Sequence, residues 1–445
     1  MKRPGLAFTF VCAAACFHLA AASAQTPPAP TPSPPAVVAK VLTLDECIAI
    51  ALEAQPRIQA TLGDYAAARY RVNQALAPLL PQLAGSVTAT RSESVSLSTS
   101  PTTGVTTVVP VSRQLADTFL AQVQLSQLLF DFGKNLAASE AARKLAEVAV
   151  EDVELQRQLI SLTVKEAYTN ILFAQRLIRV QEQALQRAEL NLRSAKGFFE
   201  VGIRPKSDVA RAEVDVANAR VDLIRARNAL RTARVALNIA MAIDVDSPTQ
   251  IQDNLVFQAV TMDRTQLRSE ALRQRPEYRQ VKLRVEAAEA TERQTFRNFF
   301  PDISGSGTYG GSQPQLNEQW TLGLTFSWPL FDGGARIAKY QEAKANLEAA
   351  KARVKSIELD IVQTLEQAQI AVEEAQERIQ AAQALVASAQ ENFRLAQGRF
   401  DAGVGTILDL TDAQLALTQA QNTETQGLAD YRIGLARLDR AIGRR

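Results

Sequence analysis

The sequence predicts an α+β membrane protein in which four β-strands per chain are joined to long antiparallel helical coiled coils. Three observations lead to this prediction. Apolar residues repeat every seven positions along stretches without proline. Shorter segments alternate apolar and polar residues, as strands do. Both kinds of segment recur in the same order in the two halves of the chain.

Residues 1–24 predict a secretory signal peptide. Lys2 and Arg3 precede an apolar run, and Ala22-Ser23-Ala24 forms a small-residue cleavage site. Removing this segment leaves 47 basic and 47 acidic residues, no histidine, and Cys47 as the one cysteine. This composition excludes His-based catalysis, His-ligated metal and an intramolecular disulfide. A net charge of zero argues against a nucleic acid partner. We therefore expect neither an enzyme nor a cofactor.

Residues 25–42 predict a stiff leader, because six of the ten residues at 26–35 are proline. Cys16 is a possible lipid acceptor, but the apolar run continues past it, so we do not expect lipidation. No later stretch approaches 18 uncharged apolar residues. Any insertion into a membrane is therefore expected through β-structure.

The chain contains a duplication, with a first repeat at 43–262 and a second at 263–445. Phe199, Gly202 and Asp208 recur 201 positions later as Phe400, Gly403 and Asp409. Near the start of each repeat the offset is instead 220, so the first repeat carries a longer insertion. A period near 200 residues is too long for a solenoid and indicates a duplicated domain-sized unit.

One β-hairpin is expected in each repeat, at about 82–130 and at about 302–330. The first has a Ser- and Thr-rich tip, Ser92 to Ser112, and the second a short tip near Gln313 to Glu318. Trp320 and Trp328 are expected on one face of one strand, about 19 Å apart along a tilted barrel axis. With Phe119 they predict the aromatic girdle of an outer-membrane barrel, whose apolar band is about 25 Å tall. The alternative is a half-buried strand on a soluble core.

Long helical hairpins are expected at 134–241 and 335–442. The span from Lys134 to Phe198 lacks proline and would form a helix roughly 97 Å long. Its seven-residue repeat predicts a coiled-coil seam in which alanine alternates with larger apolar residues. A helix at 57–80, ended by Pro81, and the returning helix at 206–241 are expected to stack end to end along it. The seam positions of the first long helix are Val164, Ile171, Ile178, Leu185 and Leu192, matched in the second by Leu365, Val372, Ile379, Val386 and Phe393.

Four strands cannot close a barrel, and lipid requires closure, so the chain is expected to oligomerise cyclically. Three copies would supply twelve strands.

The doubled order of these motifs resembles the TolC-type outer-membrane efflux proteins over residues 43–445. The residues that carry the resemblance are the Leu-Phe-Asp-x-Gly junctions at 129–133 and 330–334, the helix-ending Pro81 and Pro301, and the turn with Gly403, Thr406, Asp409 and Asp412. The resemblance implies a homotrimer whose twelve-stranded outer-membrane barrel is continuous with a long α-helical periplasmic tunnel. It implies the exit duct of a tripartite efflux pump or type I secretion system. The partners would be a periplasmic adaptor protein, an inner-membrane transporter and the lipid of a Gram-negative outer membrane, with most of the mass in the periplasm.

The resemblance also suggests a gate at the periplasmic tip. Asp409 and Asp412 are three residues apart at the start of a helix and so share a face. In a trimer they would place six carboxylates around a constriction, which would select cations and raise the pKa values of the acids. Asp208 is the matching acid of the first repeat. The alternative is that the helix dipole alone favours these acids.

Two turns at the same end, Val201–Ser207 and Ala402–Ile407, are expected to dock the adaptor. Gly202, Gly403 and Gly405 permit tight reversals. The alternative is that they are turns with no docking role. Phe400 stands where the family often has tyrosine, and Gly405 where it often has arginine. Arg204 or Lys206 is then left to supply the cation that links the turns.

The alternative interpretation of the whole chain is a soluble periplasmic coiled-coil adaptor protein. It explains the heptads but neither the duplicated hairpins nor the tryptophan spacing. A carboxylate-based hydrolase would need a substrate cleft that long helices do not suggest.

Overall fold

The computed structural model describes residues 41–96, 112–260, 263–313 and 317–445. These residues belong to one unit, Ala39–Arg445, which is described here by itself. The expected signal peptide, the leader up to residue 40 and most of the first hairpin tip lie outside the described residues. Within the described ranges, no helix combines the length and the hydrophobicity needed to cross a membrane.

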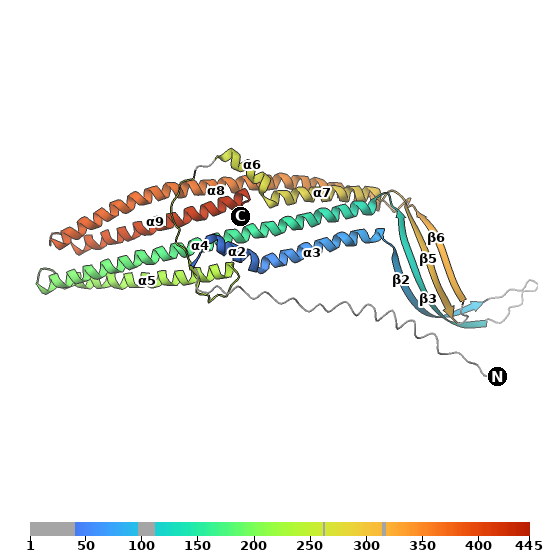
Figure 1. The fold of residues 1–445 in the computed structure, drawn as a ribbon, viewed down its shortest axis with the longest axis horizontal. Helices are drawn as coiled ribbons and strands as arrows, with labels where there is room; N and C mark the ends of the chain where they lie inside the picture. The colour runs from blue at the N-terminus through green and yellow to red at the C-terminus, as the bar shows by residue number, and fades with distance from the viewer. Residues whose placement is uncertain (1–40, 97–111, 261–262, 314–316) are drawn as a thin grey trace, which may run out of the picture. The chain divides into compact units, whose positions relative to one another are not determined.

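Two long helical hairpins dominate the fold (Figure 1). Helix α4 (Lys134–Glu200) returns as α5 (Lys206–Ala240), and α8 (Ala335–Asp401) returns as α9 (Ile407–Ile442). Both α4 and α8 have 67 residues, and they begin and end 201 positions apart. The two hairpins lie side by side because α4 packs against α9.

The predicted apolar residues of the seam inside each hairpin are buried near the middle of the long helices and half-buried toward the turns. Val164 and Ile171 of α4 and Val372 and Ile379 of α8 are fully buried. Two glycines of α9 bring its backbone close to α8. A Cβ at Gly434 would lie 3.2 Å from Val372 Cγ2, and one at Gly427 would lie 3.3 Å from Ile379 Cγ1. Small residues at such positions let two helices approach closely.

Shorter helices extend both hairpins. Helix α2 (Leu44–Ala54) buries Cys47 and Ala51, α3 (Pro56–Leu76) packs on α4, and α7 (Pro276–Arg297) packs on α4 and α8. Helix α6 (Arg264–Gln274) lies against α8 and α9. Strands β1 (Val41–Leu42) and β4 (Gln250–Ile251) form a short parallel pair.

The helix expected at 57–80 is shorter than predicted. Helix α3 ends at Leu76, and residues Ala77–Leu79 form a 3₁₀ turn. The reason is Pro78, which lacks the N–H that a further α-helical turn would need and which the prediction overlooked in favour of Pro81.

The strands form one antiparallel sheet in the order β2-β3-β5-β6. Its members are β2 (Gln82–Ser96), β3 (Ser112–Phe130), β5 (Asp302–Gln313) and β6 (Asn317–Ser327). The two predicted hairpins are joined by the pairing of β3 with β5, in the register Val123↔Tyr309. Strand β2 continues four residues past the expected tip at Ser92, because the ladder continues through Ser92↔Ala116 to Ser96↔Ser112.

One face of this sheet is apolar and the other is polar. Residues directly opposite each other share a face, so the register assigns the sides. The pairs Leu83↔Leu125, Gly85↔Val123 and Tyr309↔Trp320 lie on one side, whereas Ser86↔Gln122 and Thr308↔Thr321 lie on the other. Leu83, Val123, Trp320 and Leu322 are all exposed in the single chain. The chain therefore presents an uncovered apolar sheet face, with β2 and β6 as its edges.

The fit of β5 between its neighbours depends on glycine. A Cβ at Gly310 would lie 2.7 Å from Cβ of Gln122 in β3, closer than real Cβ contacts come. No larger residue fits here without displacing a strand.

The strand-to-helix junctions use the aspartates of the two Leu-Phe-Asp-x-Gly sequences, Asp131 and Asp332. The carboxylate of Asp131 accepts hydrogen bonds from the backbone N–H groups of Gly133 and Asn135, at 2.9 and 2.8 Å. Asp332 accepts from the N–H of Arg336 at 3.2 Å. Gly133 and Gly334 have φ of 79° and 90°, in the left-handed region that glycine adopts without strain.

Candidate functional site

The turns at the ends of the two helical hairpins have the same construction. Gly202 and Gly403 have φ of 74° and 77°, which ends α4 and α8 in the left-handed conformation. In the first turn the N–H of Ile203 donates to the carbonyl of Phe198 at 2.9 Å. In the second, the N–H of Val404 donates to the carbonyl of Arg399 at 3.0 Å. These bonds satisfy carbonyls that the helix ends would otherwise leave free.

A small apolar core ties the two turns together. It contains five buried residues from all four helices of the hairpins: Ala195, Ala212, Phe400, Ile407 and Leu410. Phe198 contacts Phe400 edge to face, with ring centroids 5.7 Å apart. The two hairpin ends are therefore packed as one body within the chain.

Arg204 links the first turn to the second. Its guanidinium donates to the carbonyl oxygen of Gly405, lies 4.9 Å from the centroid of the Phe400 ring, and is 3.6 Å from Asp208 Oδ2. The side chains of Arg204 and Asp208 are only 12% and 14% exposed. Lys206 is exposed. Of the two cations considered from the sequence, Arg204 is the one that the structure places between the turns.

Phe400 and Gly405, the two residues that depart from the family pattern, both take part in the contact between Arg204 and the second turn. Phe400 has no hydroxyl, but its ring face receives the guanidinium of Arg204. Gly405 is buried, and a Cβ there would lie 3.0 Å from backbone atoms of Arg399 and Phe400. A larger side chain at 405 is therefore not accommodated, and the position contributes its carbonyl instead.

The three acidic residues expected at the gate have different surroundings in one chain. Asp409 and Asp412 are exposed, whereas Asp208 is held beside Arg204. Asp409 is the third residue of α9 and forms a capping box with Thr406, in which Thr406 N donates to Asp409 Oδ2 at 3.2 Å. The Thr406 side chain, and after it the Thr406 N–H, lower the pKa of Asp409. Within one chain these capping bonds favour the charged form of Asp409, and the raised pKa expected from six carboxylates in a trimer stays a prediction.

The predicted girdle residues lie at two levels of the sheet. Phe119 pairs with Gln313, the last residue of β5, which is far from the helices. Trp320 pairs with Tyr309, four residues closer to the helices. Trp328 lies one residue beyond β6, because Pro329 cannot continue the ladder. Its indole N–H donates to the carbonyl of Phe299 at 3.2 Å, at the helical end of the sheet. The prediction that both tryptophans belong to one strand is therefore wrong for Trp328.

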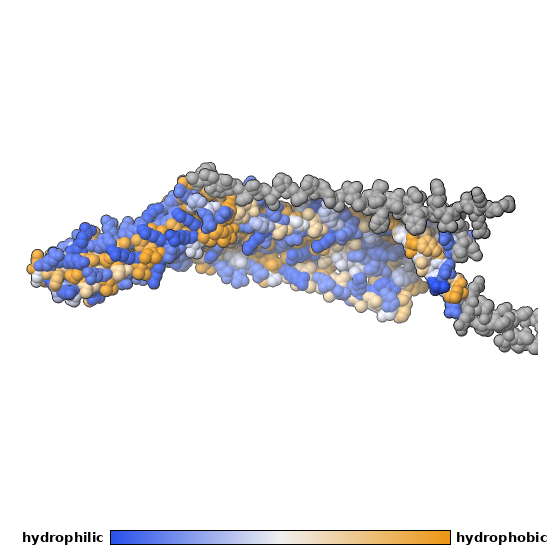
Figure 2. Space-filling view, turned by 90° about the horizontal axis from the view of Figure 1, so that it is seen from below, coloured by the Kyte–Doolittle hydropathy of each residue, from blue (hydrophilic) through white to orange (hydrophobic). Residues whose placement is uncertain are grey.

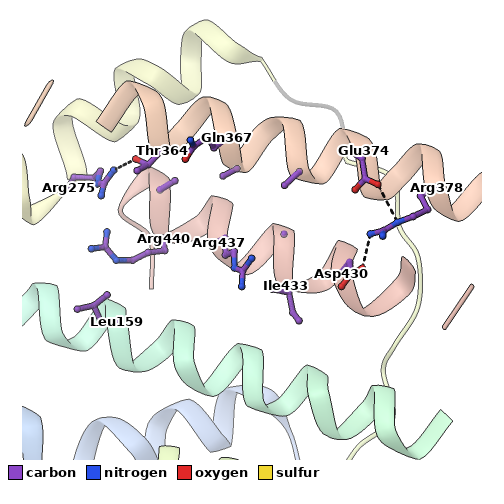
Figure 3. Close-up of a pocket in the computed structure, with 14 residues that line it drawn as sticks. Leu159, Arg275, Thr364, Gln367, Glu374, Arg378, Asp430, Ile433, Arg437 and Arg440 are labelled. Atoms are coloured by element: carbon purple, nitrogen blue, oxygen red, sulfur yellow. Dashed lines mark hydrogen bonds and ion pairs between the residues drawn. The ribbon is translucent and has the colours of Figure 1, made fainter. Parts of the chain in front are cut away.

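A cavity of about 560 Å³ lies beside α8 and α9, midway along the helical part (Figure 3). Arg275, Arg378, Arg437 and Arg440 line it together with Asp430 and Glu374. Arg378 bridges Asp430 at 2.7 Å, and Arg437 bonds Glu166 of α4 at 2.8 Å. In the described part of the chain, no group of three or more His, Cys, Asp or Glu residues is placed to hold a metal ion.

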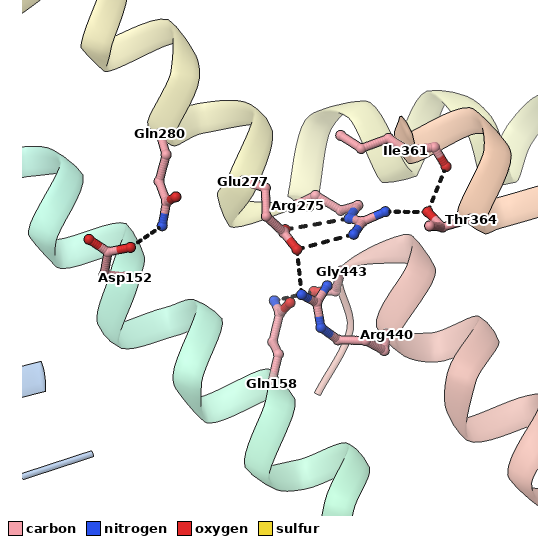
Figure 4. A network of polar contacts seen from close by, with 9 residues as sticks. All are labelled: Asp152, Gln158, Arg275, Glu277, Gln280, Ile361, Thr364, Arg440 and Gly443. Carbon is pink, nitrogen blue, oxygen red and sulfur yellow. Dashed lines mark hydrogen bonds and ion pairs between the residues drawn. The ribbon is translucent and has the colours of Figure 1, made fainter. Parts of the chain in front are cut away.

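A polar network beside this cavity joins the two repeats (Figure 4). Glu277 of α7 accepts from Arg275 at 3.1 Å and from Arg440 of α9. Burial acts to raise the pKa of Glu277, but the hydrogen bonds from Arg275 and Arg440 outweigh it and the pKa is lowered. Gln158 of α4 donates to the carbonyl of Gly443 at 2.7 Å. No local spacing in the sequence marks these residues, because they meet only through contacts between distant segments.

Comparison with known proteins identifies the family. A family model described as "Outer membrane efflux protein" matches residues 47–242 and 267–444. Nodulation protein T of Rhizobium leguminosarum bv. trifolii is 23% identical over 340 residues, covering 74% of this chain and 72% of that protein.

Two solved outer-membrane proteins share the fold. The outer membrane protein VceC of Vibrio cholerae has a TM-score of 0.74 at 20% identity, covering 90% of this chain and 96% of that one. The CmeC outer membrane channel of Campylobacter jejuni has a TM-score of 0.75 at 18% identity, covering 90% of this chain and 85% of that one. The duplicated hairpins, the four-stranded sheet and the matched family model together place this chain in the outer membrane efflux protein family.

Proposed function

We propose that three copies of this chain form one continuous exit duct, with a twelve-stranded barrel in the outer membrane and a helical tunnel in the periplasm. The observation that carries this proposal is the sheet. It has an uncovered apolar face, a polar face, and two edge strands, β2 and β6, unpaired within the described chain. Pairing β6 of one copy with β2 of the next would satisfy both edges and turn the apolar face toward lipid. A soluble adaptor protein would leave this face without cover.

The aromatic residues fit this orientation. Phe119 and Trp320 would lie toward the outer rim of the barrel, and Trp328 at its periplasmic rim. Tryptophan suits an interface because its ring is apolar and its N–H needs a polar partner. Here that partner is the carbonyl of Phe299.

The hairpin ends form the periplasmic entrance in this proposal. Asp409 and Asp412 supply the constriction, and Asp208 with Arg204 holds the two turns of each chain together. The exposed apolar residues Val201, Ile203 and Val404, beside Gly202 and Gly403, offer a surface for an adaptor protein. An inner-membrane transporter completes the proposed assembly and selects the cargo.

Conductance in a planar lipid bilayer tests the duct and its acidic constriction. Wild-type protein purified in detergent is compared with Asp409→Asn/Asp412→Asn. The matched control, Glu348→Gln/Glu391→Gln, removes two carboxylates that pair with cations on their own helix.

We expect stable cation-selective steps in the wild type and the control, and reduced cation selectivity in the gate variant. Equal selectivity in all three would place the constriction elsewhere. Protein that is soluble without detergent and never inserts would refute the duct.

A further inference from the structure

We infer that the cavity beside α8 and α9 binds an oxyanion, held at the end where Arg275, Arg437 and Arg440 meet. The inference concerns a single chain and does not depend on the proposed ring of copies. On the face of the molecule in Figure 2, apolar and polar residues are interspersed over the helices. The cavity differs from this surface because its two ends carry different charge (Figure 3).

One end of the cavity contains its own ion pairs. Nη2 of Arg378 lies 2.7 Å from Asp430 Oδ2, and its Nε lies 3.4 Å from Glu374 Oε1. Along α9, Asp430 is ten residues from Arg440, which corresponds to about 15 Å of helix. These two carboxylates are therefore held by the cation beside them and lie far from the arginines at the other end.

The other end of the cavity carries more arginines than acids. Glu277 Oε1 accepts hydrogen bonds from both Arg275 and Arg440, so one carboxylate serves two guanidinium groups (Figure 4). Arg437 precedes Arg440 by three residues on the same face of α9 and donates to Glu166 at 2.8 Å. Three cations thus meet two carboxylates, which leaves a net positive charge at this end.

This end also holds N–H donors that have no acceptor in the described part of the chain. Nε and Nη1 of Arg440 are buried and lack a hydrogen-bond partner there. A buried donor without an acceptor is costly, so an ordered water or an ion is expected to satisfy it. Because the local charge is positive, an anion fits these donors better than a neutral molecule does.

The arginines at this end are a feature of the second repeat. The corresponding residues of the first repeat are uncharged, although both repeats form the same long helical hairpin. Packing of the hairpin therefore does not require arginine at these positions. The attraction of a helix C-terminus for cations does not require it either, because the last turn of α5 has no basic residue. At the offsets of 220 and 201, Arg275 corresponds to Gln55, Arg437 to Ala236 and Arg440 to Ile239.

The size of the cavity and the shape of the donors suit a small oxyanion or a molecule that carries one. The volume of about 560 Å³ lies within the range of small-molecule sites, roughly 300–1,000 Å³. The planar fork of a guanidinium matches the oxygens of a phosphate or a carboxylate group. Such a group would join Arg275, which precedes α7, to Arg437 and Arg440 of α9. Since it binds only the folded arrangement, it is expected to stabilise the folded chain.

The effect of inorganic phosphate on the melting temperature tests this site. The full chain in detergent is heated while phosphate replaces chloride at constant ionic strength. Arg440→Gln and Arg437→Gln are compared with the wild type, and the side chain of Arg437 is 61% exposed, so its variant is expected to fold even if Arg440→Gln does not. The matched control is Arg225→Gln, which removes an exposed arginine that pairs with Asp222 on its own helix, α5. A parallel series with acetate separates phosphate from carboxylate as the preferred group.

We expect phosphate to raise the melting temperature of the wild type and of the control. In the two cavity variants, the phosphate concentration that gives half of the shift should rise by about tenfold or more, because each variant loses charge-assisted hydrogen bonds to the anion. An equal response of all four proteins would indicate a general effect of salt and would overturn the site. No response of the wild type to phosphate or to acetate would also overturn it, and would leave ordered water as the partner of the buried donors.

Discussion

Replacing Arg204 with alanine is expected to separate the two hairpin ends within a chain. The guanidinium donates to the carbonyl of Gly405, and a hydrogen bond with a charged donor contributes about 1.5–3 kcal/mol. Its position over Phe400 adds about 0.5–2 kcal/mol. Asp208 would also lose its cation while only 14% exposed. The contacts of Arg204 therefore stabilise the joined turns by about 3 kcal/mol. Their loss would shift the equilibrium between joined and separated turns by roughly a hundredfold.

Amide hydrogen exchange of residues 398–410 measures this shift directly, because local opening exposes these amides. Arg394→Ala is the matched control. It removes a cation on the last turns of α8 whose ion pair within the described residues is with Glu391 on its own helix, and we expect little change. Arg204→Lys keeps the charge but loses the planar guanidinium, so an intermediate rate is expected. Equal exchange rates in the Arg204→Ala and Arg394→Ala variants would refute the link.

Three further predictions concern the sheet, the polar network and the buried thiol. Gly310→Val is expected to destabilise the sheet by about 1–3 kcal/mol and to reduce detergent-resistant assembly, whereas Gly85→Ala, with nothing near its Cβ, should assemble normally. The lowered pKa of Glu277 gives stability that is complete above the unfolded value near ~4.3 and is lost as the pH falls through the folded pKa. Melting temperatures of Glu277→Gln should therefore depend less on pH in acid than those of the wild type. Burial raises the pKa of Cys47 to about 12, so a maleimide at pH 7 should label it only after denaturation, and labelling of the native protein would contradict this.

The sequence predicts those features that depend on local periodicity. The heptads of α4 and α8, the alternation of the strands and the offset of 201 all follow from the spacing of residues along the chain. The features that it does not predict depend on contacts between distant residues. The pairing of β3 with β5 and the three-way contact of Glu277 with Arg275 and Arg440 have no local signature. The early end of α3 is a different case, because Pro78 is itself a local signal: its missing N–H ends the helix before Pro81 does.

The turns at the ends of the helical hairpins combine features that the sequence predicts with features that depend on contacts between distant residues. The sequence reduces the linking cation to Arg204 or Lys206, since both belong to the first turn. It cannot choose between them, because the choice depends on which side chain reaches Phe400 and the carbonyl of Gly405. The capping of Asp409 by Thr406 is visible as a sequence pattern, yet its effect on the pKa requires the bond geometry.

The two glycines of α9 have a consequence for the history of the chain. Their counterparts in α5, 201 positions earlier, are Ala226 and Ala233. An alanine methyl at Gly434 would meet Val372 at 3.2 Å, so the second hairpin could accept the alanines of the first only if α8 or α9 shifted slightly. The copies produced by the duplication have thus diverged into parts that are not interchangeable. Helices α8 and α9 are matched to each other, so giving α9 alone the alanines of α5 would crowd the seam on which the second hairpin depends.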